Sequence, residues 1–260
     1  MQLPLSRAIS PALDWRDRCS STNTELVARA AELPDLAVIA TTDQTAGRGR
    51  LGRDWSAPPG SALAISMLVR LEAVPDPRRW GWLPLVAGVA VVRAVRSLGV
   101  EGAGLKWPND VLVDDAHGLP RKLSGILTEL APEGVVIGAG LNLSMTHDEL
   151  PVATATSLAL QGVPVDGDLA DRALAATLRE LRAIVAQWRS AGSPAELRAI
   201  VEPELRTIGR AVRIDRPGLD PLLGTALGLD DDGRLRVRPL GEGDEIIAVA
   251  AGDVTHLRYE

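Results

Sequence analysis

The residues best suited to chemistry in this 260-residue chain lie in a few short segments, of which the loop from Gln44 to Trp55 is the most informative. Three glycines and three arginines alternate there in the sequence Gly-Arg-Gly-Arg-Leu-Gly-Arg. Glycine lets a ligand approach the backbone, and arginine makes bidentate, charge-assisted hydrogen bonds to carboxylate or phosphate. Trp55 can add a flat apolar wall. We therefore interpret this loop as part of a site for an anionic ligand.

Two other interpretations of the loop have to be weighed. A glycine-arginine loop can be an ordinary solvated surface loop, and its Gly-Arg-Gly-Arg core is similar to arms that enter the DNA minor groove. The chain has 28 Lys and Arg against 34 Asp and Glu, a formal charge of −6, whereas nucleic-acid binding favours a basic surface. The buried strands predicted on both sides of the loop also argue against a free arm. We expect no DNA partner.

Four further segments combine polar residues with glycine or turn residues. Each has a simple structural explanation, namely a helix cap, a β-turn, a strand start or a glycine-rich strand end. The segments are Ser21-Thr22-Asn23, Lys106-Trp107-Pro108-Asn109-Asp110, Lys122-Leu123-Ser124-Gly125 and Gly138-Ala139-Gly140-Leu141-Asn142.

The use of lysine and asparagine favours a functional interpretation of these segments. Of the 28 basic residues 26 are arginine, and asparagine occurs three times. A lysine ammonium is a compact point charge, so a site that needs it cannot use the planar, forked guanidinium of arginine instead. Chance could explain the presence of any one of these residues in a segment. However, every lysine and asparagine of the chain falls in the segments named above: Lys106, Lys122, Asn23, Asn109 and Asn142.

Hydrophobic periodicity predicts the elements that must position these residues. A capping-box spacing at Thr22 to Glu25 predicts a helix that ends near Pro34, and residues 1–20 read as irregular. Strands are expected at 37–42, 62–70, 104–107, 110–113, 122–130 and 134–143, and further helices at 82–98, 168–189 and about 195–203. The last two of these strands are predicted to form a hairpin with its turn at residues 131–134.

From Leu205 the pattern changes to short β-type runs separated by Gly, Pro and Asp. Residues 211–214, 222–229, 234–240 and 246–250 are predicted strands, with a hairpin turn at 230–233. So small a β unit should dock on the larger body. We predict an α+β protein in which residues 1–204 form a mixed β-sheet flanked by helices and residues 205–260 form a small β-barrel.

Composition excludes several classes of protein. The single cysteine, Cys19, rules out an internal disulfide framework and a cysteine-rich zinc site, and it suits a reducing compartment. The N-terminal residues contain no apolar leader, and the longest apolar run, 80–92, is interrupted by Pro84. It is far shorter than the ~20 residues of a membrane span. We expect a soluble, cytoplasmic protein without a membrane partner.

In order and spacing, the five segments over about residues 20–145 resemble the motif set of biotin protein ligases. The C-terminal β unit is similar to that family's SH3-like domain, and the resemblance implies a class II synthetase-like ligase core. Members that also repress transcription carry a helix-turn-helix domain before the Ser-Thr-Asn motif. Only 20 residues precede that motif here, so we expect the ligase-only type.

The resemblance implies an ATP-dependent reaction with Mg²⁺ that forms biotinoyl-5′-AMP. The biotin then passes to a lysine of the biotin carboxyl carrier domain of a biotin-dependent carboxylase. The implied catalytic residues are Lys122, Arg50 and Asp110, where Asp110 orients Lys122 or a metal-bound water. The implied nucleotide site comprises Arg50, Arg53, Lys106, Asn109 and Asn142. The implied biotin site comprises Ser21, Thr22, Asn23, Gln44, Gly47, Arg48, Gly49, Arg50, Trp55, Lys122, Gly125 and Gly140.

Some roles stay unassigned, and two alternatives stay open. No metal ligand is assigned, and no role is expected for His117, His147 or His256, which lie outside the segments. The first alternative is a lipoate or other acyl ligase of the same fold. Cys19 does not stand where the related octanoyl transferases place their nucleophile, and the glycine-arginine loop favours biotin. The second alternative is a non-catalytic, ligand-sensing DNA-binding regulator.

Overall fold

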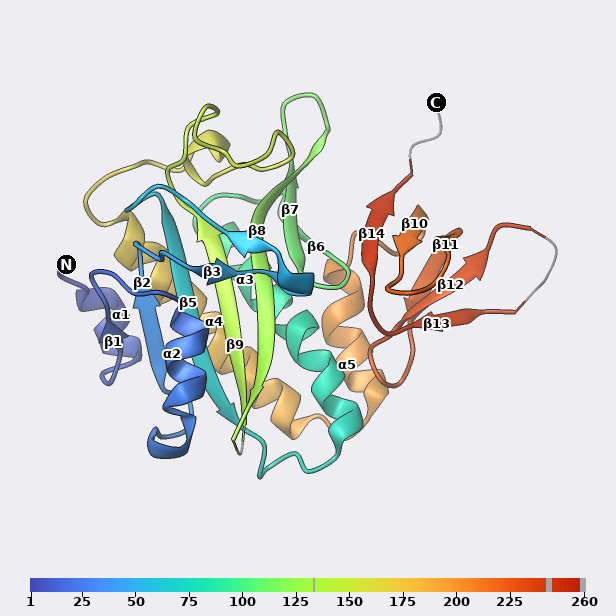
Figure 1. Cartoon of the computed structure of the whole chain (residues 1–260), viewed down its shortest axis with the longest axis horizontal. Coiled ribbons are helices and arrows are strands. Elements are labelled where there is room, and N and C mark those ends of the chain that lie inside the picture. Colours follow the sequence, from blue (N-terminus) through green and yellow to red (C-terminus); the bar gives the residue numbers. More distant parts are fainter. Residues whose placement is uncertain (133, 242–244, 258–260) are drawn as a thin grey trace.

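A computed structural model describes residues 1–132, 134–241 and 245–257 (Figure 1). Its larger part is built on a seven-stranded sheet in the order β1-β2-β5-β9-β8-β7-β6. Strand β1 runs parallel to β2, and the other neighbours are antiparallel, so the predicted mixed sheet is confirmed. The strands span Asp14–Trp15 (β1), Val38–Thr41 (β2), Ala62–Arg70 (β5), Gly104–Lys106 (β6), Asp110–Asp114 (β7), Pro120–Ala131 (β8) and Gly134–Asn142 (β9).

Helices cover both faces of this sheet (Figure 1). Alternate residues of a strand point to opposite faces. Ile39 of β2 therefore packs under Leu26 of helix α2, while its neighbours Val38 and Ala40 join the main core with helices α3 and α4. The helices span Pro4–Ile9 (α1), Thr22–Ala28 (α2), Leu83–Ser97 (α3), Leu169–Ser190 (α4) and Pro194–Val201 (α5).

The C-terminal part is a five-stranded antiparallel sheet in the order β13-β12-β11-β10-β14. The predicted turn at 230–233 joins β11 to β12, where the Gly233 N–H donates to the Asp230 carbonyl. The strands span Ala211–Asp215 (β10), Leu222–Leu229 (β11), Leu235–Pro239 (β12), Ile247–Val249 (β13) and Asp253–His256 (β14). Part of the predicted C-terminal unit, residues 242–244 and 258–260, and Glu133 of the predicted 131–134 turn lie outside the described residues.

The C-terminal sheet docks on the larger part through two buried tryptophans. The Trp82 indole N–H donates to the Asp231 carbonyl at 3.1 Å, and the Trp107 backbone N–H donates to the Thr207 hydroxyl at 3.0 Å. Both indoles are at most 2% exposed, and one continuous apolar core contains residues of both parts. The expected docking is thus present, and it lies next to the Trp107-Pro108 turn.

Several predicted elements need correction. Residues 1–20 are not irregular, because the buried Asp171 carboxylate of α4 accepts the backbone N–H groups of Leu5 and Ser6 and thereby anchors α1. The N-cap of α2 is Ser21, whose hydroxyl accepts the Thr24 N–H, and the helix ends at Ala28 rather than near Pro34. Strand β14 was not predicted. The glycine-arginine loop contains a short hairpin, Gly47–Arg48 (β3) with Asp54–Trp55 (β4), and a 3-10 turn at Arg50–Gly52 between them.

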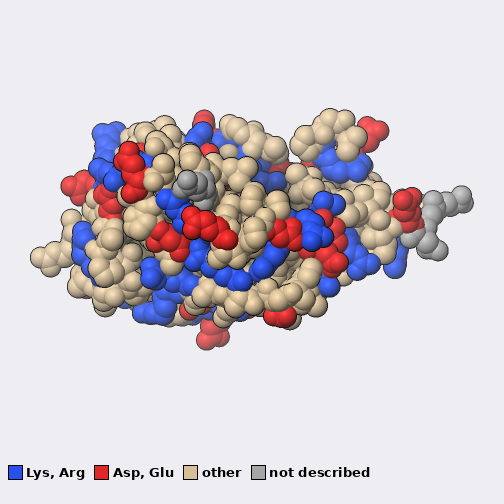
Figure 2. Space-filling model, turned by 90° about the horizontal axis from the view of Figure 1, so that it is seen from below, with Lys and Arg blue, Asp and Glu red and all other residues tan. Residues whose placement is uncertain are grey.

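The described surface has mixed character. None of the described helices combines the length and apolar composition needed to cross a bilayer. Lysine and arginine side chains are interspersed with aspartate and glutamate on the face that Figure 2 shows. This pattern agrees with a composition in which basic and acidic residues are nearly balanced. The predicted absence of DNA and membrane partners stays a prediction.

Candidate active site

A cavity of about 1060 Å³ lies between the glycine-arginine loop, strands β8 and β9 and the C-terminal sheet. All five segments singled out in the sequence line it. Of the predicted site residues only Gly47 is missing from its wall, and it lies just behind: a Cβ there would stand 2.3 Å from Gln44 Nε2. The structure thus brings together residues that are up to 121 positions apart, from Ser21 to Asn142.

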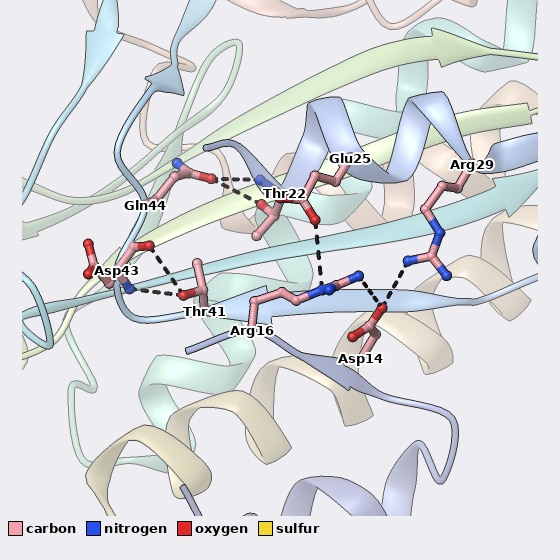
Figure 3. Close-up of polar contacts among 8 residues, drawn as sticks. All are labelled: Asp14, Arg16, Thr22, Glu25, Arg29, Thr41, Asp43 and Gln44. Carbon is pink, nitrogen blue, oxygen red and sulfur yellow. Dashed lines mark hydrogen bonds and ion pairs between the residues drawn. The ribbon is translucent and has the colours of Figure 1, made fainter. Parts of the chain in front are cut away.

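One end of the cavity is a polar cradle at the N-terminus of α2. Gln44 Oε1 accepts a hydrogen bond from the Thr22 backbone N–H at 2.9 Å and lies 3.2 Å from the Thr22 hydroxyl oxygen (Figure 3). The Asn23 amide donates to the Leu127 carbonyl and to Glu129. These three side chains are therefore held in fixed orientations by protein partners.

Ion pairs at the outer strand hold α2 in place (Figure 3). Asp14 of β1 accepts from both Arg16 and Arg29 at 2.9 Å, and Arg16 also lies 3.7 Å from Glu25 of the helix. Each pair is partly exposed and is worth at most ~1 kcal/mol, but the shared Asp14 links them into a network. The N-terminal segment thus braces the helix that carries the cradle.

The hairpin of the glycine-arginine loop places Trp55 over the middle of the cavity. Gly140 of β9 lies beneath the indole, since a Cβ at Gly140 would come within 2.6 Å of the ring. The Lys122 ammonium is 5.8 Å from the centre of the same ring. The indole therefore packs directly on the glycine floor of the sheet, and Trp55 forms a flat apolar wall in the middle of the cavity.

Lys122 is directed into the cavity by a bulge in strand β8. Val111 pairs with Ser124 and Leu112 pairs with Lys122, so Leu123 is an extra residue between two ladder positions. A bulge of this kind redirects the neighbouring side chains. The Lys122 ammonium lies 2.6 Å from the Asp110 carboxylate, and a Cβ at Gly125 would stand 3.1 Å from the same ammonium. The predicted partnership of Asp110 with Lys122 is therefore present in the structure.

The loop arginines contact separate parts of the chain. Arg48 lies 3.2 Å from Glu129, Arg50 donates to the Asn109 amide oxygen at 3.0 Å, and Arg53 pairs with Asp253 of β14 at 2.6 Å. The asparagines of the predicted nucleotide site are also engaged, because Asn109 donates to Ile126 and Asn142 donates to Thr156.

Two cations are partly desolvated at the other end of the cavity. Burial lowers the pKa of Lys106, and the neighbouring Lys122 adds to this effect, while Asp110 and Asp253 oppose it. Burial likewise lowers the pKa of Arg50. A cation that loses water without a full set of counter-charges stabilises an added anion. This end of the cavity therefore suits phosphate or carboxylate.

Sequence reasoning missed the contribution of the C-terminal sheet. Arg206, Asp253 and His256 line the same cavity, although no role was expected for His256. The imidazole lies 3.2 Å from the Thr207 hydroxyl. Burial, with the nearby cations Lys106, Arg210 and Arg206, lowers the pKa of His256 to about 4. No local motif marks these residues, because only the docking of the C-terminal sheet brings them to the cavity.

The neutral imidazole makes stability depend on pH. An unfolded histidine has a pKa near ~6.5, so between about pH 6.5 and 4 the unfolded chain binds more protons at His256 than the folded chain does. Its contribution to stability is therefore present above about pH 6.5 and is lost as the pH falls toward 4. We expect the drop in Tm between pH 7 and pH 5 to be smaller for His256→Gln than for the wild type, as measured by calorimetry. The exposed His117→Gln should keep the wild-type slope, and equal slopes for all three proteins would contradict the assignment.

Comparisons with known proteins agree with this geometry. The biotin/lipoate A/B protein ligase family model matches residues 15–142, and the biotin protein ligase C-terminal domain model matches residues 207–257. The chain is 43% identical to a biotin–[acetyl-CoA-carboxylase] ligase of Mycobacterium tuberculosis, over 95% of this chain and 89% of that protein. It is 35% identical to a bifunctional ligase/repressor of Escherichia coli, over 97% of this chain and 74% of that protein.

Solved structures give the same result. The biotin protein ligase of Aquifex aeolicus, in complex with biotin and ATP, superposes with a TM-score of 0.77 at 26% identity, over 94% of this chain and 99% of that one. The Leishmania major enzyme in complex with biotinyl-5-AMP shares the fold, with a TM-score of 0.61 at 22% identity, over 96% of this chain and 99% of that one. The expected α+β ligase fold with its C-terminal β domain is therefore confirmed, and the chain belongs to the biotin protein ligases of the biotin/lipoate A/B protein ligase family.

Proposed function

We propose that this protein activates biotin with ATP and then transfers it to a lysine of a carrier protein. The supporting observation is one cavity that has a polar cradle at one end, the apolar wall of Trp55 in the middle and partly desolvated cations at the other end. A bicyclic urea, an alkyl chain and a carboxylate fit these regions in that order. We take residues 1–204 as the ligase domain and residues 205–260 as the SH3-like domain.

The first step joins two anions. A carboxylate oxygen of biotin attacks the α-phosphorus of ATP, the bond to the bridging oxygen breaks, and pyrophosphate leaves. Lys122 and Arg50 stabilise the negative charge that builds up on the phosphate oxygens. Asp110 holds the Lys122 ammonium in place at 2.6 Å. The apolar wall formed by Trp55 keeps water away from the mixed anhydride that forms.

The nucleotide end would be served by Arg53, Lys106, Asn109 and Asn142 beside Arg50. Mg²⁺ commonly binds through one or two protein carboxylates together with the phosphates of its nucleotide. Among the described residues no three His, Cys, Asp or Glu side chains form a metal cluster. An ion that arrives with ATP fits this donor set, and Asp110 is a carboxylate within reach of the cavity.

In the second step the amine of an acceptor lysine attacks the carbonyl of the adenylate. AMP leaves with the bonding electron pair, and the amine loses a proton as the amide forms. The M. tuberculosis relative is named for acetyl-CoA carboxylase, which supports a carboxylase carrier domain as the acceptor. We place this activity in the cytoplasm.

The test is direct detection of the intermediate. The protein is incubated with ATP, Mg²⁺ and biotin, and the products are analysed by mass spectrometry for biotinoyl-5′-AMP. Biotin-dependent ATP–pyrophosphate exchange should accompany it, and lipoate should not compete. Exchange that depends on lipoate instead of biotin would favour the acyl-ligase alternative, and no adenylate with either acid would refute the proposal.

A further inference from the structure

Ser66, in the middle of strand β5, is a buried polar residue beneath the cradle. Its hydroxyl oxygen lies 2.6 Å from Asn23 Oδ1 and 2.7 Å from Thr22 Oγ1. It does not line the cavity itself. A buried hydroxyl in contact with two cradle residues can orient them without touching the ligand.

The donors and acceptors of this cluster can be assigned one by one. The Asn23 amide nitrogen donates to the Leu127 carbonyl and to a Glu129 carboxylate oxygen at 2.7 Å, so Asn23 Oδ1 can only accept. The single Ser66 proton therefore points to Asn23. Consequently the 2.7 Å contact between the two hydroxyls requires Thr22 to be the donor and Ser66 to be the acceptor, and the longer 3.2 Å contact of the Thr22 hydroxyl with Gln44 Oε1 carries no proton.

With this assignment of donors and acceptors, the Thr22 hydroxyl oxygen remains able to accept a hydrogen bond from a ligand in the cavity. Gln44 Oε1 accepts the Thr22 backbone N–H, so the Gln44 amide nitrogen is left as a donor. The cradle therefore presents an acceptor at Thr22 and a donor at Gln44. A cyclic urea carries the complementary pair, because its N–H donates and its carbonyl accepts.

We propose that Ser66 is a positioning residue that determines specificity for the ring end of biotin. By donating to Asn23 it commits the Thr22 hydroxyl to act as an acceptor, so that Thr22 receives a ring N–H of the ligand. The proposal rests on the proposed function, since it takes biotin as the ligand. Ser66 acts through Thr22 and contributes nothing to the nucleotide end.

The experiment measures biotin binding by calorimetry in the absence of ATP. Ser66→Ala should weaken biotin binding roughly tenfold, about the value of one hydrogen bond. The KM for ATP and kcat should stay within about twofold, because only binding of the ring is changed. The control Ser6→Ala removes an equally buried hydroxyl that donates to Asp171, and it should lower the Tm without changing biotin affinity.

A double-mutant cycle separates positioning from a general loss of packing. Thr22→Val removes the hydroxyl through which Ser66 is proposed to act, so adding Ser66→Ala to Thr22→Val should weaken biotin binding by less than about twofold. If Ser66→Ala does not fold, Ser66→Cys provides a weaker donor of similar shape and should show an intermediate loss. An equal penalty in both backgrounds, or wild-type affinity in Ser66→Cys, would overturn the proposal. A wild type that binds biotin but forms no adenylate would instead refute the proposed function.

Discussion

Lys122→Arg is expected to slow formation of biotinoyl-5′-AMP by roughly 100- to 1000-fold, the usual cost of losing one donor aimed at a transition state. The positive charge is kept, so the effect must come from shape. The ammonium fits between the Asp110 carboxylate at 2.6 Å, the Trp55 ring and the floor at Gly125. A planar guanidinium is wider and would displace either the indole or the carboxylate.

The measurement is ATP–pyrophosphate exchange at saturating biotin and ATP. The matched control is the reverse substitution at the neighbouring position, Arg121→Lys. It also keeps the charge, but Arg121 pairs with Asp115 outside the cavity. That variant should retain activity within about threefold. If Lys122→Arg also exchanges near the wild-type rate, the role given to Lys122 is wrong.

Arg50→Gly should give an enzyme that releases its intermediate. Burial lowers the pKa of Arg50, and among the described residues its guanidinium donates one side-chain hydrogen bond, to the Asn109 amide oxygen at 3.0 Å, so donors remain for an anion. Loss of one charge-assisted hydrogen bond costs ~1.5–3 kcal/mol and should speed release of the adenylate roughly 10- to 100-fold. Adenylate formation should survive in part, because Lys122 and Arg48 remain. The released anhydride will then acylate any accessible lysine.

The test supplies ATP, biotin and an unrelated lysine-rich protein, and labelling of that protein is compared per adenylate formed. Glycine also loosens the loop, so the control is Leu51→Gly. Leu51 is 58% exposed and has a φ of 56°, a conformation that glycine adopts readily. The Leu51→Gly variant therefore adds flexibility to the loop and removes no charge. Equal bystander labelling by Arg50→Gly and by the wild type would show that Arg50 does not retain the intermediate.

The elements that are long apolar segments could be predicted from sequence. Strand β5 begins and ends as expected, and helix α3 differs by one residue at each end, because both are nearly continuous apolar runs. Helix α1 and strand β14 were missed for a physical reason. The cap of α1 comes from Asp171, about 165 positions away, and β14 is stabilised by pairing with β10.

The residues of the candidate site also include some that the sequence could predict and some that it could not. Residues inside short motifs, such as Lys122 and Trp55, could be selected because residue type and spacing carry the signal. His256 could not be selected, since its place in the cavity depends on the docking of a separate sheet. Ser66 was missed because a serine within a buried strand looks like any other small residue. The roles given to individual site residues stay predictions until the variants are measured.

The glycine floor beneath Trp55 limits how this pocket can change over time. Gly138 and Gly140 stand on one face of β9, where a Cβ would meet Asn23 and Trp55 at 2.2 and 2.6 Å. Every other amino acid carries a Cβ, so any substitution at these two positions collides with Asn23 or Trp55 unless that side chain moves. Space for a bulkier acid must therefore arise elsewhere in the wall of the cavity, by trimming Trp55. Laboratory evolution toward larger biotin analogues should accordingly accumulate changes in the hairpin and leave the strand untouched.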